Sequence, residues 1–213
     1  MPERDAPKSV IRRLPVYVRI LDNMIRNDID IISSRELSEV TGFTAEQIRK
    51  DLAYFGAFGT RGTGYNTSVL REKILEIIGL NEQTNIIVVG SGHLGIALAR
   101  HNIRKNPYVN VVAIFDIDPE IIGGNILGVE IMPLSRLPEV VAEYRVKVAI
   151  LTVPAAHAQN AVEPISKSGI NVIFNLTTAM LEVPGHIHVH SVDLSIELQS
   201  LIYYATHDKD SMR

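Results

Sequence analysis

The feature that most constrains how this chain can fold is a short turn with three glycines, Gly90-x-Gly92-x-x-Gly95. The β-branched run at 85–89 predicts a buried strand, and residues 94–105 have the apolar spacing of a helix. In such a turn the first glycine permits the tight bend, the second lets a bound phosphate approach the backbone, and the third lets the helix pack on the strand. The spacing therefore predicts a βαβ unit whose helix N-terminus can hold an anion.

An acidic residue at the end of the next predicted strand narrows the expected ligand. Asp116 follows Gly95 by 21 residues and ends the β-branched run at 109–115. A carboxylate there accepts the ribose hydroxyls of NAD and repels the extra phosphate of NADP, whereas Asp118 lies further into the loop. The alternative is a glycine turn that serves packing alone. We expect an NAD(H) site made by Asp116 and the turn residues Gly90, Ser91, Gly92, His93, Leu94 and Gly95.

The remaining runs of the second half predict an α/β domain of Rossmann type. Apolar runs at 146–153 and 170–175 are separated by a helical stretch at 155–167. Continuous Val, Ile and Leu residues, rather than alternation, indicate a parallel sheet covered on both faces. Ligands bind at the carboxyl ends of such strands, although ordinary loop chemistry is the alternative for any single residue there. Four further residues are expected to line the same crevice: Thr152, Val153, Pro154 and Asn175.

The first 80 residues have helical spacing with several capping signals. Pro15 suits the first position of a helix that runs to about Asn27. Ser33 with Glu36, and Thr44 with Gln47, have the spacing of two capping boxes, and Gly42 separates them. Two short capped helices joined by a tight glycine turn predict a helix-turn-helix.

A glycine-rich stretch follows the predicted helix-turn-helix. Residues 55–65 hold four glycines, interleaved aromatic residues and Arg61, which predicts a hairpin of two short strands, or wing. The stretch 68–78 then predicts an amphipathic helix that ends at Gly79. The N-terminal part is therefore expected to be a winged helix-turn-helix domain.

A domain of this type places its second short helix in the major groove of DNA. The exposed candidates on that helix are Gln47, Arg49 and Lys50, with Thr44 as its cap. Arg61 at the wing tip could enter the minor groove. Arg12 and Arg13, expected just before the first helix, would contact the DNA backbone. The alternative is a polar face that binds another protein.

The charge distribution leaves DNA binding open. The whole chain has a net charge of −3, but residues 1–80 carry 12 Lys and Arg against 11 Asp and Glu, a net charge of +1, and residues 81–213 carry −4. A local basic patch on an acidic protein can still contact phosphates.

The end of the chain predicts a helix at 193–206 that is apolar on more than one side. One stripe holds Leu194, Leu198, Leu201, Ile202 and Ala205, and Ile196, Tyr203 and Tyr204 lie largely off it. Such a helix is expected to be buried between two bodies, the second of which could be another subunit. We expect three parts: a DNA-binding domain at 1–80, a nucleotide-binding domain at 81–192 and a dimer-exchange helix at 193–213.

Composition excludes several other classes. The chain has no cysteine, so it has no disulfide, thiolate metal site or thiol nucleophile, which fits a reducing intracellular setting. The N-terminus does not resemble a signal peptide, and no apolar run is long enough to span a bilayer. The expectation is a soluble cytoplasmic protein without a membrane partner.

Residues for catalysis are not evident. Hydride transfer needs an acid or base beside the nicotinamide and a place for substrate, yet only one helix follows the last predicted sheet strand. His186, His188 and His190 alternate on one face of a predicted strand, where a polar edge strand is a simpler interpretation than a metal site. We expect no catalytic residue and no metal, with an NAD-dependent oxidoreductase carrying an accessory domain as the alternative.

Several stretches closely resemble the Rex family of redox-sensing repressors. They are the run 49–65 (RKDLAYFGAFGTRGTGY), the run 13–21, the glycine turn and residues 151–154. The similarity follows the family's order along nearly the whole chain. The run 49–65 is far more specific than the glycine turn.

The resemblance implies a non-enzymatic repressor with a winged helix, a Rossmann domain and a C-terminal helix swapped between two subunits. It implies a homodimer that binds a palindromic operator, NAD+ permitting binding and NADH releasing it. It assigns phosphate or base contacts to Arg49, Lys50 and Arg61, and a switch pair across the dimer to Arg19 and Asp193. Where some relatives have a switch tyrosine, this chain has His101, whose imidazole could substitute with added pH dependence.

A third hypothesis is a DNA-binding protein that senses another adenine ligand, such as coenzyme A. Asp116 favours a ribose with free hydroxyls, which the 3′-phosphate of coenzyme A would not supply.

Overall fold

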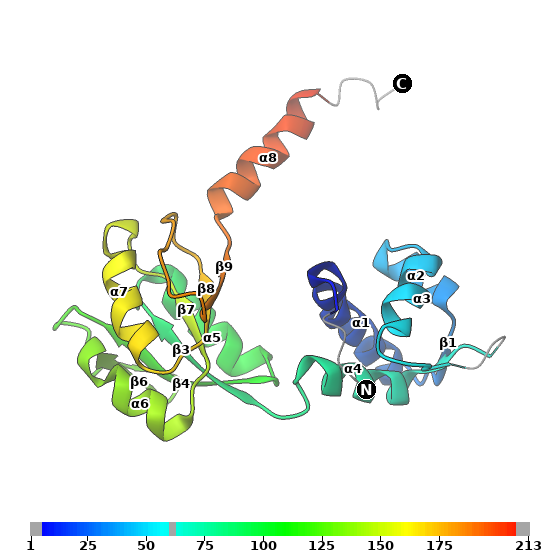
Figure 1. Ribbon diagram of the computed structural model, residues 1–213, viewed down its shortest axis with the longest axis horizontal. Helices are drawn as coiled ribbons and strands as arrows, with labels where there is room; N and C mark the ends of the chain where they lie inside the picture. The colour runs from blue at the N-terminus through cyan, green and yellow to red at the C-terminus, as the bar shows by residue number, and fades with distance from the viewer. Residues whose placement is uncertain (1–5, 60–62, 208–213) are drawn as a thin grey trace. The chain divides into compact units, whose positions relative to one another are not determined.

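The computed structural model of this 213-residue chain describes residues 6–59 and 63–207 (Figure 1). The chain divides into two compact units, residues 1–82 and residues 83–213. The division falls two residues beyond the boundary expected from the sequence, and the C-terminal helix belongs to the second unit.

Unit 1 packs helices around a small apolar core. Its described helices are α1 (Lys8–Arg26), α2 (Ser34–Thr41), α3 (Ala45–Ala53) and α4 (Thr67–Ile78). The largest core side chains come from all four helices and include Leu14, Tyr17, Leu21, Leu37, Ile48, Leu70 and Ile74, each at most 1% exposed.

The start of the first helix was predicted wrongly. The helix α1 begins at Lys8, and Pro15 lies inside it rather than at its first position. A proline inside a helix removes a hydrogen bond and costs about 3 kcal/mol. The turns before Pro15 bury Val10 and Leu14 in the core, and that burial offsets the cost.

The caps of the two short helices agree closely with the sequence. Ser33 caps α2 in a complete capping box with Glu36, and Gly42 ends α2 in the left-handed conformation. Thr44 caps α3 by accepting a hydrogen bond from the backbone N–H of Gln47. The structure gives no reciprocal bond from the Gln47 side chain, so this second box is only half formed.

The glycine-rich stretch differs from the predicted hairpin. The strand β2 (Tyr65–Asn66) pairs antiparallel with β1 (Ile31–Ile32), which lies more than 30 residues earlier. Residues 55–59 contain no strand, and Arg61 lies outside the described residues. The two arms of the loop still meet, because a Cβ on Gly59 would lie 2.7 Å from the backbone oxygen of Gly64. The error arose because local pattern carries no information on a partner so distant in sequence.

Unit 2 is built on a seven-stranded sheet of order β5-β6-β4-β3-β7-β8-β9. The strands are β3 (Thr84–Val89), β4 (Val109–Asp116), β5 (Asn125–Ile126), β6 (Val129–Pro133), β7 (Val148–Leu151), β8 (Val172–Asn175) and β9 (His188–Ser191). All neighbouring strands are parallel except β5 and β6. Omitting the short β5, the order is that of a doubly wound dinucleotide-binding sheet.

Both faces of the sheet are covered, as the apolar runs predicted. Ile87 and Val89 of β3 pack on the side of α6 (Leu137–Tyr144) and α7 (Ala155–Lys167). Ile86 and Val88 of the same strand pack on the side of α5 (His93–Lys105). Alternate residues of β3 are therefore buried on opposite faces.

The segment 125–144 was not divided into elements at the level of sequence. It forms the hairpin of β5 and β6, a 3₁₀ turn η1 (Leu134–Arg136) and the helix α6. Pro138 near the first position of α6 was an available signal.

The C-terminal helix α8 (Leu194–His207) follows the edge strand β9 (Figure 1). Its large apolar side chains are between 52% and 63% exposed: Leu194, Ile196, Leu198, Leu201, Ile202, Tyr203 and Tyr204. The protomer therefore leaves uncovered the apolar surface that the sequence placed on this helix.

Among the residues described, no helix combines the length and apolar character needed to cross a membrane.

Candidate functional site

The three glycines of the turn have different structural roles. Gly90 has a φ of +102°, and a Cβ there would lie 2.8 Å from the backbone nitrogen of Val153. A Cβ on Gly95 would overlap the backbone oxygen of Gly90. A Cβ on Gly92 would meet nothing within 4 Å. The fold itself thus requires glycine at the first and third positions, whereas at the second position glycine leaves open space at the start of α5.

The start of α5 is suited to an anion. Gly92 is the N-cap residue and has no side chain to satisfy the first N–H groups, and the first turn contains no acidic residue. A helix N-terminus of this kind presents N–H groups and a positive dipole end to a phosphate.

Asp116 lies beside the glycine turn, as predicted from its spacing. Its Oδ2 accepts hydrogen bonds of 2.6 Å from both the backbone N–H and the hydroxyl of Ser91. Its Oδ1 accepts from the backbone N–H of Ile117 at 2.7 Å and of Asp118 at 3.2 Å. Partial burial raises the pKa of Asp116, but these four hydrogen bonds outweigh burial and leave the pKa below its ordinary value. The carboxylate is therefore anionic at neutral pH.

A pocket of about 400 Å³ opens at the carboxyl ends of β3, β4 and β7. Six of the predicted residues line it: Gly90, Gly92, Asp116, Thr152, Val153 and Pro154. The other lining residues are Val89, Phe115, Ile117, Leu134, His157, Asn160 and Ala161. The sequence thus predicted the location of the pocket but not its whole wall.

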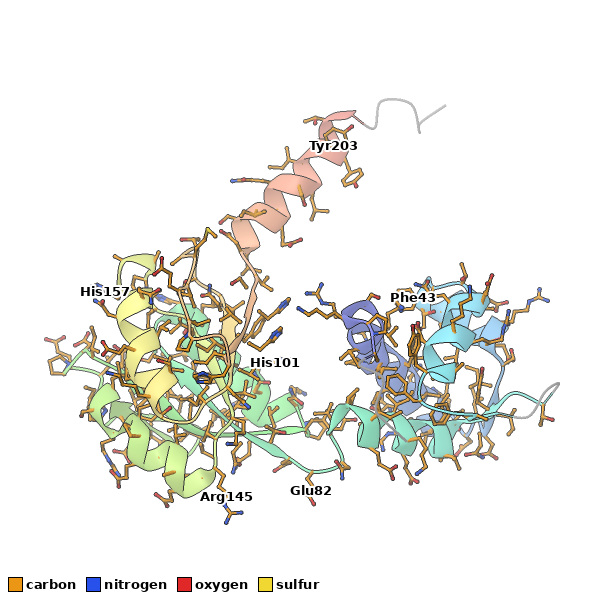
Figure 2. All side chains as sticks on the ribbon, viewed as in Figure 1. Phe43, Glu82, His101, Arg145, His157 and Tyr203 are labelled. Carbon is orange, nitrogen blue, oxygen red and sulfur yellow. The ribbon has the colours of Figure 1, made fainter. Side chains whose placement is uncertain are left out.

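Two polar residues of this wall were missed as site residues. His157, labelled in Figure 2, and Asn160 lie three residues apart on α7, and both line the pocket. Thr152 is committed elsewhere, since its hydroxyl donates to the backbone oxygens of Gly90 at 2.8 Å and Val89 at 3.2 Å. The signal that was available is the position of α7, which begins at the carboxyl end of β7.

Several predicted residues do not line the pocket. Ser91 is 4% exposed, and its hydroxyl donates a hydrogen bond to Asp116. Gly95 is buried against Gly90. His93 and Leu94 lie exposed in the first turn of α5. These residues shape the turn or extend beyond the pocket.

Asn175 is placed in a structural role. It is fully buried, and its Nδ2 donates to the backbone oxygen of Ala179 and to the hydroxyl of Ser191. Its Oδ1 accepts from the backbone N–H and the hydroxyl of Thr177. The side chain holds the loop after β8 and is absent from the pocket wall, because its hydrogen-bonding groups are already used.

A second cavity, of about 490 Å³, lies near the amino ends of β3 and β4 beside the C-terminal end of α5. Arg104 and Lys105 line it, but its lining includes neither a helix N-terminus for a pyrophosphate nor a carboxylate for a ribose. The pocket at Asp116 is the better nucleotide site.

The exposed face of α3 carries the candidates for DNA contact. Nη1 of Arg49 donates to the hydroxyl of Ser34 at 2.9 Å, and Nζ of Lys50 lies 2.7 Å from Glu46. Lys50 and Glu46 are both about 70% exposed, so their ion pair contributes little to stability and can open. Gln47 is half-buried on the same helix.

Arg13 is placed differently from expectation. It lies within α1 rather than before it, and its guanidinium makes an ion pair of 2.6 Å with Asp51 of α3. The side chain is 16% exposed. The misplacement followed from starting the helix at Pro15.

The three switch candidates lie on three different helices or at their starts. Arg19 is exposed on α1 of unit 1. His101, labelled in Figure 2, is exposed on α5 of unit 2. Asp193 precedes α8, and its Oδ1 accepts hydrogen bonds from the backbone N–H groups of Ser195 and Ile196. A pairing of Arg19 with Asp193 across a dimer stays a prediction.

The predicted histidine-rich strand is an edge strand, but it is shorter than expected, because His186 lies in the turn before it. His188 and His190 lie in β9 at the end of the sheet, and the ring of His190 stacks on Phe174 with a centroid distance of 5.8 Å. Within residues 6–59 and 63–207, no three His, Cys, Asp or Glu side chains are grouped to hold a metal ion.

Comparison with known proteins agrees with both units. A family model described as "CoA binding domain" matches residues 81–179, and one described as "Putative DNA-binding protein N-terminus" matches residues 5–53. A redox-sensing transcriptional repressor Rex from Natranaerobius thermophilus is 57% identical over 94% of this chain and 92% of its own length. The Rex from Carboxydothermus hydrogenoformans is 42% identical, with 95% and 97% covered.

Solved structures give the same result. The protein RSP in complex with β-NAD+ and operator DNA matches with a TM-score of 0.90 and 37% identity, over 97% of this chain and 95% of that chain. RSP in complex with β-NADH matches with a TM-score of 0.85 and 35% identity, over 97% of both chains. The predicted fold class, a DNA-binding N-terminal domain followed by a Rossmann-type domain, is confirmed. This chain belongs to the Rex family of redox-sensing transcriptional repressors.

Proposed function

We propose that this chain is a redox-sensing repressor that binds a palindromic operator as a homodimer and is released when NADH binds. Its occupancy of DNA would then follow the ratio of NADH to NAD+. One observation carries the proposal. A Rex repressor matches 94% of this chain, and the chain contains both the pocket beside Asp116 and the capped helix pair α2–α3.

At the nucleotide site, the pyrophosphate would lie at the N-terminus of α5, where Gly92 leaves the approach open. The ionised Asp116 would accept the ribose hydroxyls and repel the 2′-phosphate of NADP. Its four acceptor positions are already used by Ser91, Ile117 and Asp118, so the Ser91 hydroxyl must turn away as the ribose binds.

The wall of the pocket fits the adenosine half of the ligand. The pocket opens beside Asp116 and is bounded by apolar side chains of Ile117, Leu134 and Val153. The polar side chains of this wall not committed to a hydrogen bond in the described structure are His157 and Asn160. We assign to these two residues the hydrogen bonds to the base or the ribose.

At the DNA site, α3 would enter the major groove with Gln47, Arg49 and Lys50 facing the duplex and Thr44 fixing the start of the helix. The weak surface bonds of Arg49 and Lys50 would exchange for phosphates or base edges. Arg61, outside the described residues, stays the proposed contact of the wing.

The dimer would be built around α8. Seven large apolar side chains of this helix are more than half exposed, and a second copy of the chain would cover them. A two-fold dimer presents two copies of α3, which matches an operator with two half-sites.

The ligand can act as a signal only if it binds the two states of the protein differently. NADH and NAD+ differ by one positive charge and by the planarity of the nicotinamide ring, so discrimination must arise around that ring. We propose no enzymatic activity, because no acid–base pair was identified in the sequence beside the glycine turn. A protein acting on operator DNA is expected in the cytoplasm.

The second candidate is a DNA-binding protein that senses coenzyme A. The match of residues 81–179 to a family model described as a CoA binding domain is the observation in its favour. The two candidates predict different ligands for the same pocket. Competition between NADH and coenzyme A, followed by NADH fluorescence, separates them.

The deciding experiment uses a DNA duplex that the wild-type chain selects from a random-sequence pool. Fluorescence anisotropy with NADH and NAD+ titrated separately is expected to show release by NADH and retention with NAD+. Unchanged DNA affinity in the presence of saturating NADH would contradict the proposal, and turnover in a hydride-transfer assay would revive the oxidoreductase alternative.

A further inference from the structure

Three side chains from two helices of unit 1 form a buried cluster that the proposed function does not use. Nε and Nη2 of Arg13 donate to Oδ2 and Oδ1 of Asp51 at 2.6 and 2.7 Å. The hydroxyl of Tyr17 donates to the same Oδ2 at 2.7 Å. Arg13 and Tyr17 lie one turn apart on α1, and Asp51 lies on α3. We call Arg13, Tyr17 and Asp51 the α1–α3 clasp.

The clasp also reaches the turn before α3. The guanidinium carbon of Arg13 lies 5.8 Å from the ring centroid of Phe43, and the ring of Tyr17 meets Phe43 edge-on at 6.0 Å. Both geometries are favourable aromatic contacts. Phe43 directly precedes Thr44, the cap of α3. Helix α1 therefore holds both the start of α3, through Phe43, and its middle, through Asp51.

Burial makes these contacts specific. Asp51 is 2% exposed and Tyr17 is 1% exposed. A bidentate pair of guanidinium and carboxylate fixes both distance and angle, which a lysine or a single hydrogen bond would not do. A buried carboxylate left without its partner is strongly unfavourable, so α3 cannot turn on α1 while Asp51 stays paired.

The charges explain why the cluster suits a DNA-facing helix. A free carboxylate on α3 would repel phosphates, and Arg13 neutralises it. The hydrogen bond with Asp51 raises the pKa of Arg13, and burial followed by the hydrogen bond to Asp51 raises the pKa of Tyr17. Because its guanidinium is already paired with Asp51, Arg13 is poorly placed to serve as a phosphate contact.

We propose that the α1–α3 clasp sets the angle of α3 and thereby the recognition of DNA sequence, with Arg13, Tyr17 and Asp51 as positioning residues rather than DNA contacts. The proposal rests on the proposed DNA-binding function. It has one consequence for the switch, because Arg19 lies on the same helix as two members of the clasp. A displacement of α1 would carry α3 with it.

The main test uses the double variant Arg13→Gln/Asp51→Asn, which removes the ion pair and leaves net charge unchanged. Affinity is measured for the selected duplex and for a scrambled duplex of equal composition, over a series of salt concentrations. We expect the double variant to lose about tenfold or more in affinity for the selected duplex. Affinity for the scrambled duplex, which depends on charge, should stay within about twofold, and the salt slope should be unchanged.

Two further variants make the test decisive. Lys50→Ala, the matched control, should weaken binding to both duplexes and reduce the salt slope by about 0.9 for each phosphate that the lysine neutralises. Tyr17→Phe removes one hydrogen bond and no charge, and it should lower the ratio of selected to scrambled affinity by about fivefold. It serves in place of the double variant if that chain does not fold. NADH affinity should be unchanged in every variant.

Two results overturn the clasp alone. One is an unchanged ratio of selected to scrambled affinity in the double variant and in Tyr17→Phe, including an equal loss for both duplexes. The other is a fall in salt slope like that of Lys50→Ala. A wild-type chain that selects no duplex from the pool overturns the proposed DNA-binding function, and the clasp proposal with it.

Discussion

At the scale of single residues, the glycine turn separates what the fold needs from what a ligand needs. Gly90 and Gly95 are required by the chain, because a Cβ at either position would collide with backbone atoms. Gly92 has no such neighbour and a φ of −63° that any residue can adopt. We propose that glycine is needed at this position because a bound phosphate approaches the backbone closely.

This difference gives a matched pair of variants. Gly95→Ala should destabilise unit 2 by about 2 kcal/mol or more, as expected for an overpacked core, and lower its midpoint of thermal unfolding. Gly92→Ala should cost no more than about 1 kcal/mol, the difference between glycine and alanine at an N-cap, and so lower that midpoint less than Gly95→Ala does. It should weaken NADH binding at least about tenfold, because its Cβ would occupy the phosphate approach. Wild-type NADH affinity in Gly92→Ala would contradict the assignment of the pyrophosphate to this turn.

The hydrogen bonds of Asp116 predict a pH dependence of stability. The pKa of Asp116 is lower in the folded chain than its ordinary value. The stabilisation is therefore complete above the ordinary pKa of about 4 and is lost as pH falls through the lower folded pKa. Thermal unfolding between about pH 7 and pH 3 should show a shallower acid loss in Asp116→Asn than in the wild-type chain. Parallel acid profiles of the two chains would show that Asp116 does not contribute to the pH dependence of stability.

His157 and Asn160 predict a loss confined to one half of the nucleotide. His157→Leu and Asn160→Leu should weaken AMP and NADH by the same factor, about five- to tenfold each, since each variant removes one hydrogen bond to the adenosine half. The ratio of NADH to NAD+ affinity should stay at the wild-type value. Gln159→Leu on the same helix is the control, because the Gln159 side chain bonds Glu182 and does not line the pocket. Unchanged AMP affinity in both variants would show that His157 and Asn160 do not contact the adenosine half of the nucleotide.

At the scale of elements, short-range signals located helices well and failed at pairings distant in sequence. The caps at Ser33 and Thr44 and the stop at Gly79 were predicted correctly, because each acts within three or four residues. Pro15 was interpreted as a helix start, yet burial of Leu14 continues α1 through it. The strand β2 was expected in a hairpin and pairs instead with β1.

At the scale of the whole molecule, α8 is the element that a single protomer does not explain. Its large apolar side chains are more than half exposed along the helix. Full burial of one such side chain contributes about 1.5–3 kcal/mol, so a second copy covering several of them would gain substantial stability.

The exposed helix predicts how the assembly can be broken. Leu198→Glu should convert a dimer to a monomer at micromolar concentration, because it places a charge in the apolar interface. Gln199→Glu, which adds the same charge at a neighbouring polar position, should remain a dimer. Sedimentation velocity measures both, and a dimeric Leu198→Glu chain would show that α8 is not the main contact.

The sequence by itself determined the features that depend on neighbouring residues. The glycine turn, the spacing of Asp116 and the helix caps reflect local sterics and hydrogen bonding, and they were enough to predict the fold class. The family was predicted from the resemblance carried by stretches such as the run 49–65. The tertiary structure decided what joins distant residues. It paired Arg13 with Asp51, 38 residues away, enclosed Asn175 in hydrogen bonds, and brought His157 and Asn160 to the pocket of Asp116. The physical reason is that a hydrogen bond or an apolar contact between such residues exists only after packing, so no local pattern encodes it.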